Sequence, residues 1–120
     1  MRFDFDLFSR IAARAYRKGN PYSLEECLGV FRCYFQEYEK YMGRPHPPIK
    51  AEQIARLMEK MPYVDQLGNG GLADLEAEEY ENLINLHFKT KYRRCDYNIN
   101  HFFSGRVREM RAYESGAGYV

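Results

Sequence analysis

Hydrophobic residues recur along most of this chain of 120 residues at the spacing of one face of an α-helix. The clearest stretch covers about residues 23–42, where Ser23 and Glu26 form a capping-box pattern and Gly43 provides a stop. Its apolar positions alternate in steps of four and three: Leu24, Leu28, Phe31, Phe35, Tyr38 and Met42. The pattern predicts a long helix with one continuous apolar stripe.

Four further helices are predicted from the same periodicity. They are expected over about residues 6–18, 49–61, 74–92 and 96–114. Asp4 or Asp6 is a suitable N-cap for the first of them and Asp96 for the last. The third predicted helix should bury Ile54, Leu57, Met58 and Met61. Residues 44–48, Arg-Pro-His-Pro-Pro, cannot be helical and predict an extended connector.

These elements predict an all-α fold, a small bundle of about five helices in one domain over residues 1–114. Aromatic rings of the second, fourth and fifth helices should share the core. Residues 115–120 are expected to form a loose C-terminal tail. Residues 63–73 contain Gly-Asn-Gly-Gly and predict a flexible loop, with a short hairpin as the alternative because Asn-Gly favours a type I′ turn.

Composition narrows the class of protein. Aromatic residues make up 16% of the chain and hydrophobic residues 45%, which excludes a disordered polar chain. No apolar run is long enough for a membrane span, and the first residues do not resemble a signal peptide. Three cysteines without a CxxC spacing suit a reducing compartment, so a cytoplasmic location without a zinc site or other cofactor is expected.

Charge is arranged in blocks, although the net charge is only +1. Residues 1–22 carry a net +3, residues 63–82 carry −6, and residues 83–95 carry +4. A general binder of polyanions would show a clear basic excess, which is missing here. The blocks are compatible with one basic and one acidic face.

The acidic block is the first candidate for binding a partner protein. Its candidate residues, an acidic edge at the start of the fourth predicted helix, are Asp74, Glu76, Glu78, Glu79 and Glu81. They would stabilise the helix dipole, or they would dock on a basic protein groove in place of nucleic-acid phosphates. Metal-dependent nuclease chemistry is disfavoured, because the carboxylates follow one helix edge and lack the EF-hand pattern.

Two basic sets are candidates for binding nucleic acid. The first is a strip of Arg10, Arg14, Arg17 and Lys18, which suits phosphate or an acidic protein surface and equally a solvated helix face. The second suggests a helix-turn-helix reader of DNA. It comprises Lys89, Lys91, Arg93 and Arg94 for phosphates, and Asn100, His101, Ser104, Arg108 and Arg111 on the last helix. Base-edge contacts would come from Asn100, Ser104 and Arg108.

The histidines form no catalytic triad. His46 lies between prolines and is expected to be exposed, and His87 is expected to form hydrogen bonds at the edge of the core. His101 lies close enough in sequence to Cys95 to suggest a Cys–His pair, but no oxyanion donor or pocket accompanies it. The sequence therefore does not predict an enzyme.

Tyrosine is abundant beyond what the core stripes use. Six tyrosines fall partly outside those stripes: Tyr22, Tyr34, Tyr41, Tyr63, Tyr97 and Tyr119. Exposed tyrosine is enriched at protein interfaces, because its ring offers a large and rigid amphipathic contact. A small helical chain with surplus tyrosine and separated charges is more typical of a binding protein than of a catalyst.

Residues 95–105 (CDYNINHFFSG), continuing to 111–114 (RAYE), resemble short accessory proteins of bacterial phages and conjugative elements. Residues 34–54, with HPPIK at 46–50, are similar to the same group. The resemblance implies a regulator or an inhibitor of host defence, with anti-CRISPR proteins among the examples, and it implies no catalytic residue.

The first hypothesis is therefore a non-enzymatic binding protein of a phage or mobile element that blocks a surface of a larger protein or nucleoprotein partner. In its sharpest form the partner is a nucleic-acid-guided nuclease, and the protein is an anti-CRISPR-type inhibitor. The alternative is a helix-turn-helix-like transcriptional regulator that binds DNA, and the third hypothesis is a small nuclease. No membrane and no small-molecule substrate is predicted as a partner.

Overall fold

The computed structural model describes residues 2–61, 76–91, 95–103 and 107. These ranges hold five helices and no strand: α1 (Phe5–Ala15), α2 (Leu24–Met42), α3 (Ala51–Lys60), α4 (Ala77–Lys89) and α5 (Ile99–Phe102). The protein is thus a small all-α bundle, as predicted. The predicted loop at 63–73, the tail at 115–120 and most of the predicted 96–114 helix beyond residue 103 lie outside the described residues.

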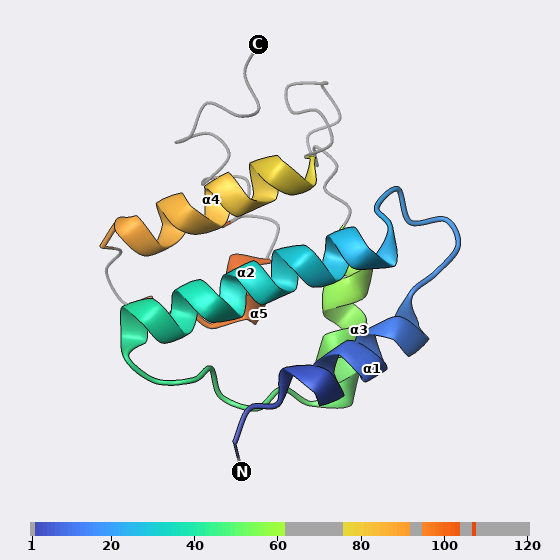
Figure 1. Cartoon of the computed structure of the whole chain (residues 1–120), viewed down its shortest axis with the longest axis horizontal. Helices are drawn as coiled ribbons and strands as arrows, with labels where there is room; N and C mark the ends of the chain where they lie inside the picture. Colours follow the sequence, from blue (N-terminus) through green and yellow to red (C-terminus); the bar gives the residue numbers. More distant parts are fainter. Residues whose placement is uncertain (1, 62–75, 92–94, 104–106, 108–120) are drawn as a thin grey trace.

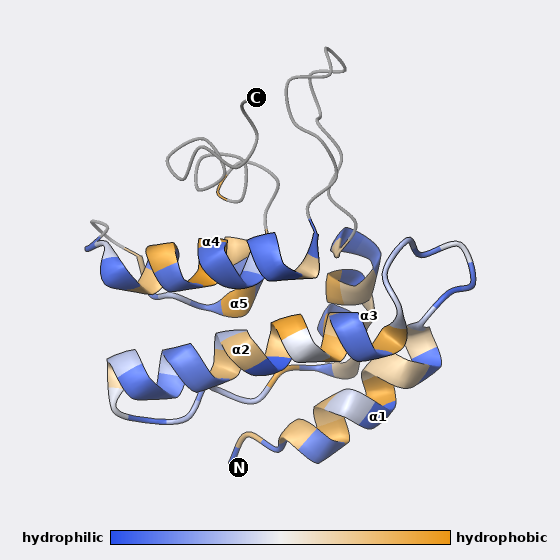
Figure 2. Ribbon diagram, turned by 45° about the horizontal axis from the view of Figure 1, so that its top comes forward, coloured by the Kyte–Doolittle hydropathy of each residue, from blue (hydrophilic) through white to orange (hydrophobic). Residues whose placement is uncertain are grey.

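The two longest helices form the centre of the bundle. α2 and α4 lie side by side and run in the same direction, while α1 and α3 pack against each other beside one end of α2 (Figure 1). Hydrophilic and hydrophobic residues alternate along each of the four longer helices, as amphipathic packing requires (Figure 2). α5 is a single turn that packs its Phe102 ring on Tyr34 of α2 and His87 of α4.

The predicted start and end signals of α2 are confirmed. The Glu26 amide donates to Ser23 Oγ at 3.0 Å, and the Ser23 amide donates to Glu26 Oε1 at 2.9 Å, which completes the capping box. Gly43 ends the helix with a φ of 72°, in the left-handed region that glycine adopts without strain. Asp4 caps α1 in the same way, because its Oδ1 accepts from the Asp6 amide at 2.9 Å.

The predicted ends of three helices are wrong. α4 covers Ala77–Lys89 rather than about residues 74–92, because Glu76 and Thr90 on either side of it are extended. α1 stops at Ala15 rather than near residue 18, because Tyr16 turns extended and its hydroxyl donates to the carbonyl of Tyr22, which ties down the loop that follows. The N-cap of α5 is Asn98 rather than Asp96. Asp96 instead accepts from the Asn98 amide at 3.0 Å in a turn that places Tyr97 at a φ of 59°.

Aromatic rings fill the core, and Tyr34 of α2 lies in the middle of them. Its ring centroid lies 5.0 Å from that of Phe88 and 5.3 Å from that of Phe102. Its hydroxyl donates to the backbone carbonyl of Tyr97, 63 residues away in sequence. The predicted core of the second, fourth and fifth helices is confirmed. α1 adds Phe8, whose centroid lies 5.0 Å from that of Phe35.

Three of the tyrosines that the sequence placed partly outside the core are buried, which corrects that prediction. Tyr22, Tyr34 and Tyr97 are 5%, 0% and 4% exposed. A tyrosine side chain can bury its ring and still reach a backbone carbonyl with its hydroxyl, as Tyr97 does to Thr90 at 2.8 Å. Tyr41 is exposed, as expected. Tyr63 and Tyr119 lie outside the described residues.

His46 is also buried, contrary to the expectation of an exposed loop residue. Its Nδ1 lies 2.8 Å from the carbonyl oxygen of Pro47, and the Ile99 amide donates to its Nε2 at 3.1 Å. The proton therefore lies on Nδ1, which donates to Pro47, and Nε2 keeps the lone pair that accepts. The connector (residues 44–50) is thus tied to the first turn of α5.

Removing the hydroxyl of Tyr34 tests the central hydrogen bond. We expect Tyr34→Phe to lower the free energy of unfolding by about 1–3 kcal/mol, because the buried carbonyl of Tyr97 loses its donor. Chemical denaturation measures the change. Tyr41→Phe, on an exposed ring, is the matched control and should change stability by less than about 0.5 kcal/mol. Equal losses in the two variants would contradict this account of the core.

Neutral His46 predicts that stability falls in mild acid. Burial lowers the pKa of His46 below its usual 6.5, against smaller opposing effects of the Pro47 carbonyl and Asp96. The unfolded chain then binds a proton that the folded protein rejects, so the free energy of unfolding decreases as the pH falls below about 6.5. Urea unfolding at about pH 7.5 and about pH 5.5 measures this. His46→Gln should reduce the pH dependence, whereas His101→Gln, on an exposed ring, should preserve it.

Candidate functional site

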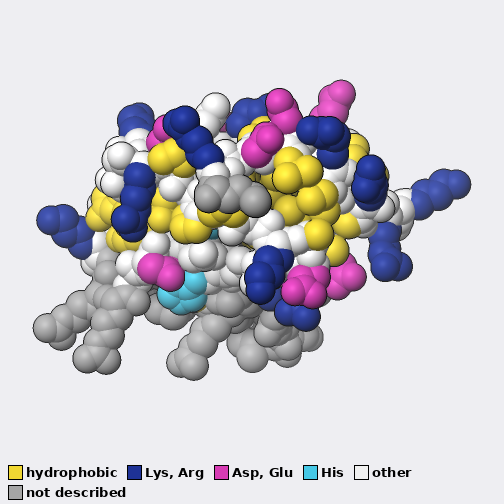
Figure 3. Space-filling view, turned by 90° about the horizontal axis from the view of Figure 1, so that it is seen from below, with side chains coloured by type: hydrophobic (Ala, Val, Ile, Leu, Met, Phe, Trp, Pro, Cys, Tyr) yellow, Lys and Arg dark blue, Asp and Glu magenta, His cyan; other side chains and the backbone are white. Residues whose placement is uncertain are grey.

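Charge is divided between the two layers of the bundle. Residues 2–23 and 43–61, which include α1 and α3, carry nine Lys and Arg against four Asp and Glu. Residues 24–42 and 76–91, which include α2 and α4, carry four against eight. Figure 3 shows both Lys and Arg and Asp and Glu side chains around a hydrophobic area on the face seen from below. The excess of positive charge thus belongs to α1, α3 and their flanking segments, and the excess of negative charge to α2 and α4.

The predicted acidic edge of α4 divides into two roles. Glu79 is half-buried and its carboxylate accepts from the Glu76 amide at 3.3 Å, so it caps the start of α4. Glu76, Glu78 and Glu81 are exposed. Asp74 lies outside the described residues. Capping of the helix start therefore explains the role of Glu79, whereas Glu78 and Glu81 face solvent.

α2 adds a carboxylate to this surface. Burial raises the pKa of the Cys33 thiol to about 11, with further contributions from the negative charges of Glu81 and Glu37. Both carboxylates therefore lie in the surroundings of one thiol, although they belong to different helices. We call Glu37, Glu78 and Glu81 the acidic seam, since Glu78 lies one turn before Glu81 on α4. The sequence had grouped the acids of α4 alone and missed the contribution of α2.

The predicted basic strip is only partly a helix face. Arg10 and Arg14 lie on α1 and are exposed, whereas Arg17 and Lys18 follow the end of the helix and are also exposed. Arg10 Nε donates to the Asp6 carbonyl of its own helix at 3.4 Å. Leu7, which precedes Arg10 by three residues and Arg14 by seven, is 48% exposed on the same side.

The candidates for a helix-turn-helix reader are described only in part. Lys89, Lys91 and His101 are exposed. Asn100 is half-buried, and its Nδ2 donates to Asn98 Oδ1 at 3.1 Å, so its amide takes part in the cap of α5. The other candidates lie outside the described residues: Arg93, Arg94, Ser104, Arg108 and Arg111.

The suggested Cys–His pair is brought together. Cys95 Sγ lies 3.7 Å from His101 Nδ1. Cys27 and Cys33 point to different sides of α2, as their spacing indicates, with Cys27 fully buried and Cys33 half-buried.

Within the part of the chain that the structure describes, no group of three or more His, Cys, Asp or Glu side chains could hold a metal ion. None of the helices described there is long and apolar enough to cross a membrane.

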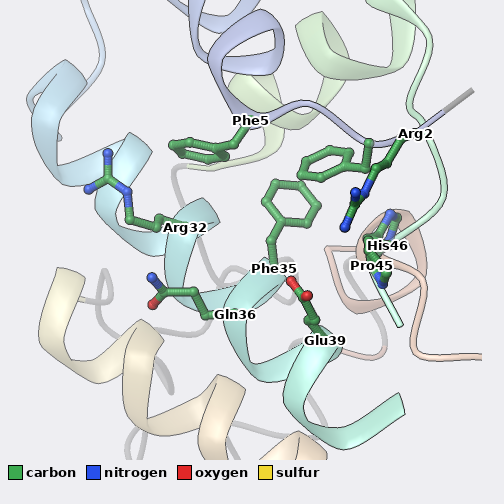
Figure 4. A pocket seen from close by; sticks show the side chains of 9 residues that line it. Arg2, Phe5, Arg32, Phe35, Gln36, Glu39, Pro45 and His46 are labelled. Carbon is green, nitrogen blue, oxygen red and sulfur yellow. The ribbon is translucent and has the colours of Figure 1, made fainter. Parts of the chain in front are cut away.

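A hollow that the sequence analysis missed lies between the N-terminal segment, α2 and the connector. Its volume is about 340 Å³. Figure 4 shows Arg2 and Arg32 on opposite sides of the Phe35 ring, with Gln36 and Glu39 of α2 along the rim. The guanidinium carbon of Arg32 lies 5.0 Å from the centre of the Phe5 ring. The spacing of Arg32, Gln36 and Glu39 on one helix face was readable, but nothing predicted that the N-terminal segment would pack beside it.

Comparisons with models of protein families, with curated proteins and with solved structures found no match to this chain.

The acidic seam predicts the reactivity of Cys33. Replacing Glu81 with Gln should lower the pKa of the Cys33 thiol from about 11, because one nearby negative charge is removed while burial remains. The pH dependence of iodoacetamide alkylation measures this in a Cys95→Ser background, where Cys27 is protected by complete burial. Glu76→Gln is the matched control and should leave the profile in place. An unchanged profile in Glu81→Gln would show that Glu81 does not act on Cys33, which would contradict the assignment of α4 to the acidic seam.

Proposed function

We propose that this protein is a non-catalytic binding protein that docks through its acidic seam on a basic groove of a larger partner. The observation that carries the proposal is the packing of α2 against α4, which brings Glu37 and Glu81, from two different helices, into the surroundings of the same Cys33 thiol. Carboxylates fixed on two packed helices form a surface, whereas acids along one helix edge are ordinary capping residues.

The seam is held in a fixed geometry by the core beneath it. Tyr34 of α2 packs on Phe88 of α4 with ring centroids 5.0 Å apart, so the two helices cannot slide independently. Fixed negative charges speed the encounter with a basic partner and select its orientation. Exposed Tyr41, near the far end of α2, offers an aromatic contact beside the charges.

A groove that normally holds nucleic acid is the partner surface that suits this seam best, since it places Lys and Arg where phosphates would lie. In its sharpest form the proposal is an inhibitor of a nucleic-acid-guided nuclease encoded by a phage or mobile element. This form follows from the resemblance to accessory proteins of such elements that is predicted for residues 34–54 and 95–105.

Charge reversal on the seam tests the proposal. Glu37→Lys, Glu78→Lys and Glu81→Lys together should abolish capture of the partner, because like charges would face its basic groove. Affinity capture, followed by reconstitution with the purified partner, measures the loss, and added nucleic acid should compete. Asp6→Lys, Glu52→Lys and Glu59→Lys form a control of equal charge change on exposed residues of α1 and α3, and should retain the partner.

The regulator alternative makes the opposite prediction. Exposed Lys89 and Lys91 at the end of α4 favour it, since exposed lysines can contact phosphates. Under the acidic-seam proposal the purified protein should not retard random duplex DNA at moderate salt. Tight binding that weakens steeply from about 50 to 300 mM salt, and that is lost in Arg108→Ala with Arg111→Ala, would favour the regulator instead.

A further inference from the structure

One side of α1 presents a surface that the acidic seam does not use. Leu7 is 48% exposed, and Arg10 and Arg14 follow it by three and seven residues, so the three side chains share one side of the helix. We call these three residues the basic α1 face. An exposed leucine beside two arginines suits a partner that offers apolar contact as well as negative charge, whereas phosphate alone would leave the leucine in water.

The apolar part of this face extends beyond a single side chain. A small hollow of about 80 Å³ opens beside Leu7, and half-buried Ile11, exposed Pro48 and half-buried Ile49 also line it. Asp4 lies at its rim, but the Asp4 carboxylate accepts a backbone hydrogen bond at 2.9 Å and caps the start of α1. The basic α1 face is therefore the edge of an apolar surface that a partner can reach.

A matching surface is present on the same chain. Leu7 and Tyr41 are the two large hydrophobic side chains that are exposed among the described residues, and Tyr41 is 43% exposed. Tyr41 follows Glu37 of the acidic seam by one turn of α2, so an exposed ring lies beside a negative charge. One exposed apolar group thus accompanies the arginines of α1, and the other accompanies the acidic seam.

The spacing and placement of the charges suit a contact between two copies. Arg10 and Arg14 are one turn apart on α1, and Glu78 and Glu81 are one turn apart on α4, so two ion pairs can form side by side. α1 and α4 lie on opposite sides of α2, so the two surfaces of one copy cannot meet each other (Figure 1). The layers that carry them have opposite excess charges, as described above.

We propose that a second copy of this chain binds, through its acidic seam and Tyr41, to the basic α1 face of the first. The contact joins two different surfaces, so each copy keeps one surface free and further copies can add. A contact of a few exposed side chains is weak, with an expected Kd of about 10–100 µM, and salt weakens it by screening the ion pairs. The proposal rests on the acidic seam of the proposed function, so a basic partner and a second copy compete for that seam.

Sedimentation velocity of the full chain is the direct test, with a reductant present because the free cysteines of different copies could otherwise form disulfides. The mean mass should rise from about 5 to about 200 µM protein at ~50 mM salt, and return to that of a monomer at ~300 mM salt. Leu7→Gln should weaken the association by about fivefold, because an apolar contact is lost. A monomer throughout this range would overturn the proposal. If that monomer retarded duplex DNA through Arg10 and Arg14, the face would belong to nucleic acid instead.

Complementation of two variants tests the head-to-tail arrangement. Arg10→Gln with Arg14→Gln removes the charges of the basic α1 face, and Glu37→Gln, Glu78→Gln and Glu81→Gln together remove those of the acidic seam. Each variant alone should be monomeric. Their equimolar mixture should form a dimer and nothing larger, because each variant retains one intact surface. Association of either variant with itself, or a mixture that stays monomeric, would contradict the proposed contact.

Arg44→Gln with Arg56→Gln is the matched control, since it removes two exposed arginines outside the basic α1 face. It should leave the Kd within about twofold of the original value. A loss equal to that of Arg10→Gln with Arg14→Gln would show nonspecific attraction and overturn the contact. Circular dichroism checks that each variant is folded.

Capture of a basic partner separates this proposal from the proposed function. Arg10→Gln with Arg14→Gln leaves the acidic seam intact, so it should lose self-association and retain the partner. A chain that captures the partner but never associates with itself would overturn the contact between copies and leave the proposed function standing. Self-association without capture of any partner would do the reverse.

Discussion

A single neutral imidazole, that of His46, holds distant parts of the chain together. It donates to its own connector through Nδ1 and accepts from the Ile99 amide through Nε2, 53 residues further on. Its ring also packs on Phe35 and Tyr38 of α2 with centroids 5.2 Å and 4.6 Å apart. The position of the connector, the start of α5 and one wall of the hollow therefore depend on the same side chain.

The aromatic core explains why so short a helix as α5 can have a fixed place. A single turn has little stability of its own, because helix nucleation is unfavourable. Here Ile99, Phe102 and Phe103 are fully buried, and the Tyr34 hydroxyl binds the Tyr97 carbonyl just before the helix starts. Packing and two long-range hydrogen bonds, rather than helix propensity, thus determine the local structure of residues 97–103.

Local signals in the sequence predicted most of the helices, and tertiary contacts account for the errors. The capping box of Ser23 and Glu26 acts within one turn, so it was readable and is confirmed. The prolines around His46 correctly excluded a helix, but they carry no information on which surface the connector covers. Tyr34 and Tyr97 were misplaced for a similar reason, because the carbonyl that accepts from each hydroxyl is not visible in a periodic pattern.

The candidate sites show the same division between local and long-range information. The acids of α4 were readable as a block, but their extension to Glu37 depends on α2 lying beside α4, which only the fold supplies. The hollow forms because the N-terminal segment packs against α2. Nothing in the sequence indicated that Arg2 and Glu39 would line the same hollow. Arg32 and Glu39 carry opposite charges and both lie on α2, so the net charge of a segment could not indicate that they line the same hollow. The acidic seam and the hollow use different residues of α2, since Glu37 belongs to the seam whereas Arg32, Gln36 and Glu39 line the hollow. Substitutions can therefore alter one surface without touching the other.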